Sequence, residues 1–548
     1  MPKNLKINDA NGERAKGGRL SEIVINQIPL PYELPESEAA AAAEKKLKSA
    51  GVPFESLNIY RRSVDTRRRQ AIKFVWSVRA VLPCEVSDEQ LKALGASRLA
   101  PAFDPAPVTG SRISEGRPVV CGFGPGGMFA ALLLAERGYR PIVLERGGDI
   151  ASRVKAVDTF MKSGALDTEN NVQFGAGGAG TFSDGKLTTR INDPSCRYIL
   201  ETLVRFGAPE EILTQGKPHI GTDMLRGVVS AISDEVTRLG GEMLYNTRFD
   251  GIKASRGGKV TSVLTSRGEI ACGALILATG HSARDTYRVL MKQGFDVVPK
   301  SFSVGVRIEQ LQSEINKAVY GKFAGDKRLP TADYAFSWRD GECGVYTFCM
   351  CPGGSVVAAA SEEGGVVVNG MSDRMRDNIN ANAALVVGVS PESPMEFQRS
   401  LERAAFEMGG GNYSAPVQTV GGFIDRKLTE PKRVMPSYTR GIWKPSRLDT
   451  LFPENVVRML GEGLTRFERA MPGFAPHDAV LTGAETRTSS PYRVKRNDGI
   501  FTAEGFDNVY PCGEGAGYAG GIMSAAADGL RCASRLIGEY APYDGEGI

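Results

Sequence analysis

The stretch VVCGFGPGG, Val119 to Gly127, decides the fold class of this chain. Its spacing fits a βαβ dinucleotide fingerprint: Gly122 permits a tight turn, Gly124 lets the backbone approach a pyrophosphate, and Gly127 lets a helix pack close to the preceding strand. Gly126 lies within the same turn. The motif predicts a Rossmann-like unit that binds a dinucleotide.

The residues around the fingerprint complete this unit. Apolar residues precede it, and an amphipathic helix from Met128 to Gly138 is expected after it. Glu145 ends the next strand, where the ribose of a dinucleotide needs an acceptor. Arg146 follows and is a further candidate for contact with the cofactor.

The bulk composition sets limits on the class of protein. The chain has 548 residues, enough for more than one core, and its formal net charge is +4. Its nine cysteines show no paired framework, which favours a reducing compartment. With neither a secretory signal nor a long uninterrupted apolar run, we expect a cytoplasmic protein without a membrane partner.

Composition shifts along the chain predict its domain organisation. Residues 1–20 are expected to be a disordered tail, and residues 21–105 a small α+β domain with a strand at 23–28, a helix at 37–50, two long strands around a basic turn, and a short helix at 87–94. The α/β domain that carries the fingerprint and binds the dinucleotide is expected over 110–300 and 482–548. Between its halves, 301–481 predicts an inserted strand-rich α+β substrate domain with few helices.

Two later segments assign the fingerprint to FAD. Ala278-Thr279-Gly280 follows a buried strand and Gly513-Glu514-Gly515 follows the last one, and both resemble secondary signatures of glutathione-reductase-like flavoproteins. The resemblance implies that Glu514, where Asp is common, accepts from ribityl hydroxyls, and that the next helix directs its N-terminus at the flavin. It also implies cofactor contacts for four more residues: Phe249, Gly520, Gly521 and Ile522.

A glycine-rich run between Asn171 and Leu187 has more glycines than one turn needs. It predicts backbone wrapped around the cofactor, with Gly177 and Gly178 in close approach and the Thr181 and Ser183 hydroxyls available to it. The alternative is a flexible surface loop. No second strand-GxGxxG-helix unit is present, so we expect no dedicated nicotinamide domain, although NAD(P)H can still serve as a transient electron donor.

The chain also resembles a bacterial family of uncharacterised FAD-dependent dehydrogenases over most of residues 21–540. The segments that carry the likeness are 173–187, 280–286, 348–354, 361–364, 369–372, 483–491 and 513–530. This resemblance implies the flavoprotein fold, FAD and redox chemistry, with no settled substrate. We expect an FAD-dependent oxidoreductase that transfers hydride between the flavin and a small organic substrate.

His281 and Arg487 are the candidate catalytic residues. A histidine that titrates near neutrality can deliver a proton during hydride transfer, and the alternative is a structural hydrogen bond near the pyrophosphate. Arg487 can clamp a substrate carboxylate with two hydrogen bonds, and the alternative is a salt bridge to Glu485 or another acid. Arg307, on a strand of the inserted domain, faces either the cleft or solvent.

Cys349 and Cys351 permit a redox interpretation, because thiols beside a flavin can exchange electrons through a disulfide. A Cys-x-Cys disulfide closes a small strained ring, so we favour thiols that line the pocket or are buried. A metal site needs a further Cys or His pair that the sequence does not offer, and none is predicted.

Five arginines flank the turn at Asp65: Arg61, Arg62, Arg67, Arg68 and Arg69. They raise one alternative to the enzyme, a flavin-carrying protein that binds RNA through its N-terminal domain. A further alternative, independent of the arginines, is a bound flavin with a structural or sensory role. No aromatic stacking run of the RNA-binding type accompanies the arginines. We therefore expect a solvated hairpin tip or an interdomain contact there, and no nucleic-acid partner.

Overall fold

The structure is a computed structural model that describes residues 21–67, 71–101, 103–105, 108–189, 191 and 193–543. The predicted tail at 1–20 lies outside the described residues, as do Arg68 and Arg69 of the basic turn and part of the linker at 101–107. The chain forms two compact units, residues 1–101 with 214–216, and residues 102–213 with 217–548.

The first unit is an antiparallel sheet covered by two helices. Its strand order is β2-β3-β1-β4, from β2 (Ser56–Asp65), β3 (Lys73–Leu82), β1 (Ser21–Pro31) and β4 (Ala96–Arg98). β3 alternates half-buried and buried residues, as a strand with one core face should. Helix α1 (Glu36–Ser49) buries Ala39, Ala43 and Leu47, and α2 (Asp88–Leu94) begins in a capping box. The elements predicted for this region are confirmed.

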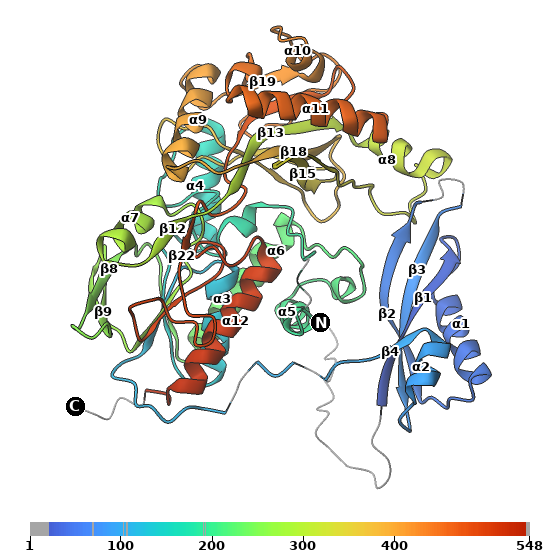
Figure 1. The fold of residues 1–548 in the computed structure, drawn as a ribbon, viewed down its shortest axis with the longest axis horizontal. Helices are drawn as coiled ribbons and strands as arrows, with labels where there is room; N and C mark the ends of the chain where they lie inside the picture. The colour runs from blue at the N-terminus through green and yellow to red at the C-terminus, as the bar shows by residue number, and fades with distance from the viewer. Residues whose placement is uncertain are drawn as a thin grey trace. The chain divides into compact units, whose positions relative to one another are not determined.

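The second unit contains the predicted parallel sheet (Figure 1). Its strand order is β23-β11-β5-β6-β7, from β23 (Val509–Pro511), β11 (Ala274–Leu277), β5 (Pro118–Cys121), β6 (Ile142–Leu144) and β7 (Glu242–Leu244). All five strands are parallel. The central position of β5 places the fingerprint in the middle of the sheet, where flanking turns can reach the same ligand.

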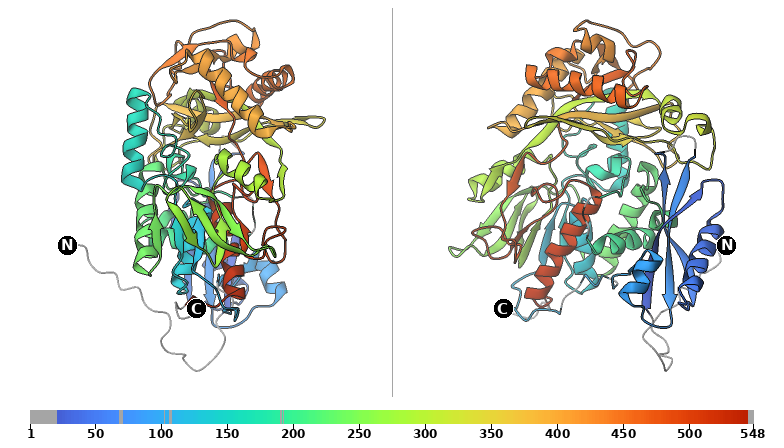
Figure 2. Two further views of the ribbon diagram at one scale, coloured as in Figure 1. Left: turned by 90° about the vertical axis from the view of Figure 1, so that its left-hand side faces the viewer. Right: turned by 45° about the vertical axis from the view of Figure 1, so that its right-hand side comes forward.

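Helices cover one face of this sheet and a meander covers the other. Helix α12 (Ile522–Glu539) lies against α3 (Pro125–Glu136), next to α6 (Thr222–Arg238) (Figures 1 and 2). The meander of β8 (Phe249–Ala254), β9 (Val260–Thr265) and β10 (Gly268–Ala271) packs on the opposite face. The expectation of an amphipathic helix after the fingerprint is wrong: α3 buries every residue from 126 to 135, because α12 covers its outer side.

Residues after 301 form a seven-stranded sheet. Its order is β14-β15-β18-β13-β21-β19-β20, from β14 (Ser337–Asp340), β15 (Cys343–Cys351), β18 (Asn380–Val389), β13 (Phe302–Leu311), β21 (Val480–Glu485), β19 (Ala415–Thr419) and β20 (Trp443–Pro445). The predicted boundary at 481 falls inside β21, which pairs with β13. Figure 1 shows α11 (Glu454–Ala470) over this sheet, on the side away from the parallel sheet.

The expectation of few helices in this region is also wrong. Besides α11 it contains α8 (Gln312–Tyr320), α9 (Pro394–Gly409) and α10 (Val420–Ile424). Charged residues between the apolar positions of α8, α9 and α11 obscured their helical pattern. The remaining elements of the second unit are α4 (Ile150–Ser163), η1 (Ala179–Phe182), α5 (Ser195–Arg205), η2 (Glu210–Leu213), α7 (Arg284–Lys292), β12 (Val297–Pro299), η3 (Gly321–Phe323), β16 (Ser355–Ala358), β17 (Val368–Met371), η4 (Leu448–Thr450) and β22 (Tyr492–Val494).

Among the described residues, no helix combines the length and the apolar character that crossing a membrane requires.

Candidate functional site

A cavity opens at the carboxyl ends of the parallel strands. The residues that end or follow β5, β6, β11 and β23 line one side of it, and residues of the seven-stranded sheet line the other. Its empty space, open solvent included, is about 1430 Å³. Ligands of open α/β sheets bind at this edge.

The fingerprint turn forms the floor of the cavity. Gly122 has φ +98°, and a Cβ atom there would lie 2.3 Å from the carbonyl oxygen of Ala278. A Cβ atom on Gly127 would lie 1.8 Å from the Gly122 carbonyl oxygen. Gly124 precedes α3, whose first turn has no side-chain cap. The free N–H groups and the positive end of the helix dipole form an anion site at the cavity.

Glu145 holds three loops together. Its carboxylate accepts hydrogen bonds from the backbone N–H groups of Phe123, Gly147 and Gly175, each at 3.0 Å. It is 4% exposed and lines the cavity. One oxygen takes two of these bonds and the other takes one, so the second oxygen keeps a free acceptor position for a ribose hydroxyl.

Arg146 lies at the same end of the cavity. Its guanidinium group donates to both oxygens of Asp285 at 3.1 Å and to Glu169 at 2.8 Å. It also stacks 4.0 Å from the centroid of the Phe174 ring. Phe249 lines the cavity nearby with Thr247 and Arg248. The charge of Arg146 is thus satisfied by protein carboxylates, and its flat face contributes to the wall.

The glycine-rich run is held by one buried arginine. Arg153, on α4, is 0% exposed and donates to five backbone carbonyl groups at 2.7–3.2 Å. The acceptors are Asn171, Val172, Gly175, Ala176 and Gly178. Because these carbonyls turn toward Arg153, the run is not the flexible surface loop of the alternative interpretation. It forms a fixed wall that contributes Gly175, Gly178 and Ser183 to the cavity.

The two later signature turns meet on the next part of the wall. Ala278, Thr279 and Gly280 line the cavity together with Gly513 and Glu514. A Cβ atom on Gly515 would lie 2.5 Å from the Gly280 carbonyl oxygen, so these turns are in contact. Gly520, Gly521 and Ile522 also line the cavity, where α12 begins without a side-chain cap. Burial raises the pKa of Glu514 to about 7, and Lys300 opposes the shift.

A buried ion pair supports the Gly513 turn from behind. Asp528 accepts from the backbone N–H of Gly513 at 2.7 Å and from Arg496 at 2.6 and 2.9 Å. Cys512 and Cys532 lie beside Asp528 with metal-ligand spacing. The Arg496 guanidinium already supplies the positive charge there, and it contacts the Cys532 sulfur at 3.5 Å.

The seven-stranded sheet, the two-stranded sheet of β16 and β17, and a loop after β21 supply the opposite wall. Phe348 and Cys349 come from β15, Asn369 from β17, Glu485 from β21, and Thr488 from the following loop. Arg307, predicted to face the cleft or solvent, is fully buried and donates to Glu485 at 2.7 Å. Burial raises the pKa of Glu485 to about 7, although Arg307 opposes the shift.

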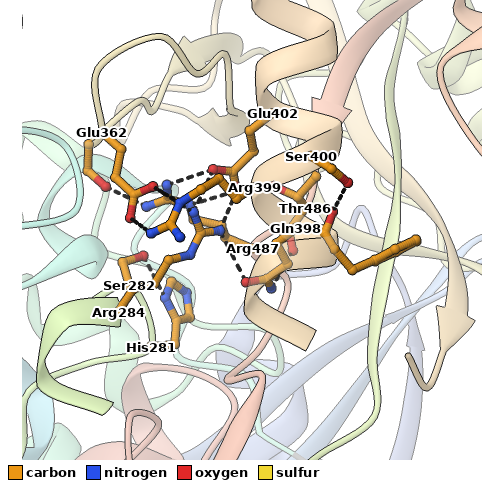
Figure 3. A network of polar contacts seen from close by, with 12 residues as sticks. His281, Ser282, Arg284, Glu362, Gln398, Arg399, Ser400, Glu402, Thr486 and Arg487 are labelled. Atoms are coloured by element: carbon orange, nitrogen blue, oxygen red, sulfur yellow. Dashed lines mark hydrogen bonds and ion pairs between the residues drawn. The ribbon is translucent and has the colours of Figure 1, made fainter. Parts of the chain in front are cut away.

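Arg487 belongs to a network around one buried carboxylate (Figure 3). Glu402, on α9, accepts two hydrogen bonds from Arg487 at 3.0 and 3.1 Å and two from Arg284 at 2.7 and 2.9 Å. Although burial favours its neutral form, the two arginines hold the pKa of Glu402 well below its usual range. The salt bridge of Arg487 is therefore to Glu402, not to Glu485, and this occupies the fork that was expected to clamp a substrate.

His281 lies beside these arginines, and its Nδ1 is 2.9 Å from the Ser282 hydroxyl (Figure 3). Burial lowers the pKa of His281 to about 4, and the charges of Arg487 and Arg284 contribute. The imidazole is neutral at neutral pH, which corrects the expectation of a histidine that titrates near neutrality. The hydrogen bond to Ser282 fits the structural alternative.

Comparisons with known proteins show the family to which this chain belongs. Residues 301–488 match the family described as "FAD-dependent protein, C-terminal domain-like". An uncharacterized protein of Clostridium beijerinckii is 46% identical over 518 residues, 90% of this chain and 95% of that protein. This chain belongs to the family of the clostridial protein, and FAD is its cofactor.

Solved structures give only distant likenesses. Glycine oxidase from Bacillus cereus is 12% identical with a TM-score of 0.33, over 78% of this chain and 99% of that one. A geranylgeranyl bacteriochlorophyll reductase-like protein from Thermoplasma acidophilum is 11% identical with a TM-score of 0.35, over 78% of this chain and 79% of that one. Scores this low do not establish a common fold.

The residues present fit FAD. The uncapped N-termini of α3 and α12 both open on the cavity, and backbone approaches it closely at Gly124 and Gly178. A Cβ atom on Gly178 would lie 3.0 Å from the Gly124 Cα, so a side chain at that position would crowd the turn that faces the cofactor. Two helix N-termini and one free carboxylate position match the pyrophosphate, flavin and ribose of FAD in chemical character.

Three predicted cofactor residues do not line the cavity. Gly127 packs beneath the turn, Thr181 is fully buried with its hydroxyl donated to the Ala176 carbonyl at 3.3 Å, and a Cβ atom on Gly177 would lie 2.1 Å from the Thr181 hydroxyl oxygen. These three residues set the backbone conformation behind the cavity and do not line it. Lining residues that were not named as candidates include Thr247, Asn369 and Thr488, and also Gln173 and Phe174 of the glycine-rich run, for which only backbone contact was expected.

The described arginines of the N-terminal turn are engaged within their own unit. Arg67 forms a salt bridge with Asp65 at 2.6 Å, and Arg61 donates to the Gly216 carbonyl at 3.1 Å. Arg62 stacks 4.9 Å from the centroid of the Phe74 ring.

Proposed function

We propose that the chain is an oxidoreductase that transfers hydride between bound FAD and a small organic substrate. The supporting observation is that two different walls enclose one cavity. Turns of the parallel sheet supply backbone N–H groups for a dinucleotide, and Phe348, Asn369 and Thr488 face the same space from the inserted region. A substrate held by the second wall lies against a cofactor held by the first, with water excluded between them.

In this proposal the protein groups have distinct tasks. The α3 N-terminus holds the pyrophosphate, Glu145 accepts from the adenosine ribose, and Glu514 accepts from the ribityl chain. The glutathione-reductase-like layout of these signatures belongs to the same proposal. Bound FAD supplies the hydride chemistry, and NAD(P)H is proposed only as a transient donor.

The ion-pair network favours a substrate with an anionic group. Four arginines of this network pair with three carboxylates, so one positive charge remains in excess. The arginines are Arg284, Arg288, Arg399 and Arg487, and the carboxylates are Glu362, Glu396 and Glu402. Arg487 borders the cavity and brings this excess to its wall. We propose Arg487 as an electrostatic residue and His281 as a neutral hydrogen-bonding one. Neither is assigned the proton transfer.

The test is anaerobic reduction of the purified flavoprotein, followed in the visible spectrum with NADH, NADPH and a library of small carboxylates, alcohols and amines. We expect one donor to bleach the flavin, and an Asn369→Ala variant to slow that step without loss of FAD. A matched control is Asn378→Ala, outside the cavity lining. Protein that shows no flavin band and gains none with added FAD would contradict the proposal.

A further inference from the structure

Cys349 and Cys351 lie at the end of β15, where the strand departs from regular geometry. In a regular strand, side chains two residues apart are separated by roughly 6.6 Å, beyond the roughly 3.5–4.5 Å between the Cβ atoms of a disulfide. Here the register with β18 shifts between Phe348 and Cys351, and Cys349 has φ +44°. The Cys351 thiol turns back toward its neighbour, with its sulfur 3.3 Å from the Cys349 carbonyl oxygen.

The two thiols differ in access to the cavity. Cys349 lines the cavity, whereas Cys351 is 0% exposed behind it. Cys349 is close enough to Glu514 and Glu485 that its negative charge contributes to the raised pKa of both carboxyls. The outer thiol therefore faces the space that the flavin-binding turns enclose.

One guanidinium group, that of Arg307, lies against the pair. The Arg307 guanidinium donates to the Cys349 carbonyl at 3.3 Å and lies 3.9 Å from the Cys351 sulfur. A hydrogen bond from Cys351 lowers the pKa of Cys349 to about 6, with Lys186 and Arg307 contributing against the effect of burial. The same hydrogen bond, with burial, raises the pKa of Cys351. The lowered pKa of Cys349 favours a thiolate at the outer sulfur, and the raised pKa of Cys351 favours a thiol at the inner one, as in an attacking and resolving pair.

We propose that Cys349 and Cys351 are a redox-active dithiol that exchanges two electrons with the bound flavin. In the oxidising direction, the thiolate and the thiol lose two electrons and one proton as the S–S bond forms. Oxidised FAD accepts these two electrons and the proton as one hydride equivalent and becomes the reduced anion. In the reverse step the reduced flavin opens the disulfide. The reduced dithiol therefore holds two further electrons beside the cofactor.

The first test is anaerobic dithionite titration of air-oxidised, FAD-loaded protein. We expect the wild-type chain to take up twice as many electron equivalents per flavin as Cys351→Ser, because only the wild-type chain holds the disulfide. Cys343→Ser, on the same strand but outside this cavity, should match the wild type. Equal uptake by wild type and Cys351→Ser overturns the proposal.

The second test is differential alkylation with mass spectrometry of the same wild-type samples, which needs no variant to fold. We expect a Cys349–Cys351 link, with the loss of two hydrogens, before reduction and two alkylated thiols after it. Cys512 and Cys532 serve as an internal control pair, because burial and their mutual hydrogen bond raise the pKa of Cys512 and keep it a thiol.

Two alkylatable thiols at Cys349 and Cys351 in the air-oxidised, flavin-loaded protein overturn this inference and leave the proposed substrate reaction unaffected. Conversely, a flavoprotein that no substrate reduces still reports its disulfide in both tests.

Discussion

The two walls of the cavity are built by different means. The wall contributed by the parallel sheet consists mainly of backbone positioned by glycines, by Glu145 and by Arg153, to which Glu145 and Glu514 add carboxylates. The wall contributed by the inserted region consists of side chains in buried ion pairs, such as Arg307 with Glu485 and Arg487 with Glu402. A dinucleotide is recognised through groups that every residue carries, whereas a substrate is distinguished by side chains.

The largest expected effect comes from Arg153→Met, which removes five donors from buried carbonyls of the glycine-rich run. We expect the free energy of unfolding to fall by about 4 kcal/mol, because each stranded acceptor carries a desolvation cost. FAD affinity should fall by about 100-fold or more, because the glycine-rich run loses the hydrogen bonds that hold it against the cofactor. A 100-fold change in Kd corresponds to about 2.7 kcal/mol of binding free energy. Urea unfolding and flavin fluorescence titration measure the two quantities.

Arg226→Met is the matched control for Arg153→Met. Arg226 stacks on the same Phe182 ring, at 4.6 Å against 4.8 Å for Arg153, and its Nε has no hydrogen-bond partner. Its replacement should cost about 1 kcal/mol or less. Equal losses in the two variants would show that ring stacking, and not the hydrogen bonds to the loop, accounts for the effect.

Glu402→Gln removes a buried charge from the wall contributed by the inserted region, as Arg153→Met does from the wall contributed by the parallel sheet. An uncharged amide leaves Arg284 and Arg487 without their buried counter-charge, and we expect a loss of about 3 kcal/mol in stability. FAD affinity should change less than threefold, because the network does not hold the predicted cofactor residues. The same two measurements apply, and a loss of FAD equal to that of Arg153→Met would erase the distinction between the walls.

The same substitution has a pH signature. Because Arg487 and Arg284 lower the folded-state pKa of Glu402, its contribution is present above the ordinary carboxyl pKa and is lost as pH falls below it. Wild type should therefore lose its excess stability over Glu402→Gln as the pH is lowered below about 4.3. A difference between the two proteins that is constant down to pH 3 would contradict the assignment.

Residues that fix the backbone conformation, above all glycines, can be identified from the sequence. The partners of buried charged side chains cannot. Glycines at fixed spacing predicted the fingerprint turn, both signature turns and the parallel sheet, because only glycine permits those close approaches. Arg153 gave a weaker signal: it shares the buried face of α4 with Val157 and Phe160, at helical spacing. Glu402 gave none, since its partners at 284 and 487 are brought together only by the fold.

Gly127→Ala adds a single Cβ atom beneath the fingerprint turn and tests whether the turn needs this close packing. The added Cβ would meet the Gly122 carbonyl oxygen at 1.8 Å, so α3 must shift away from β5. We expect a loss of about 2 kcal/mol in stability and roughly tenfold weaker FAD binding. Gly227→Ala in α6, where a Cβ meets nothing within 4 Å, should be neutral or slightly stabilising. Unchanged FAD binding in Gly127→Ala would mean that the turn tolerates the displacement.

The smallest expected effect concerns the stability of the protein without FAD, measured as its melting temperature at different pH values. Glu514 on one wall and Glu402 on the other should change this stability with opposite signs. Burial raises the folded-state pKa of Glu514 to about 7, so its contribution is present below the ordinary carboxyl pKa and is lost as pH rises toward 7. This sign is opposite to that of Glu402. Glu514→Gln removes the titration and should flatten the decline of melting temperature between pH 5 and pH 8, whereas Glu392→Gln, exposed and outside the cavity lining, should leave it unchanged. A decline that persists undiminished in Glu514→Gln would show that Glu514 is already ionised in the folded chain, with Lys300 as its counter-charge.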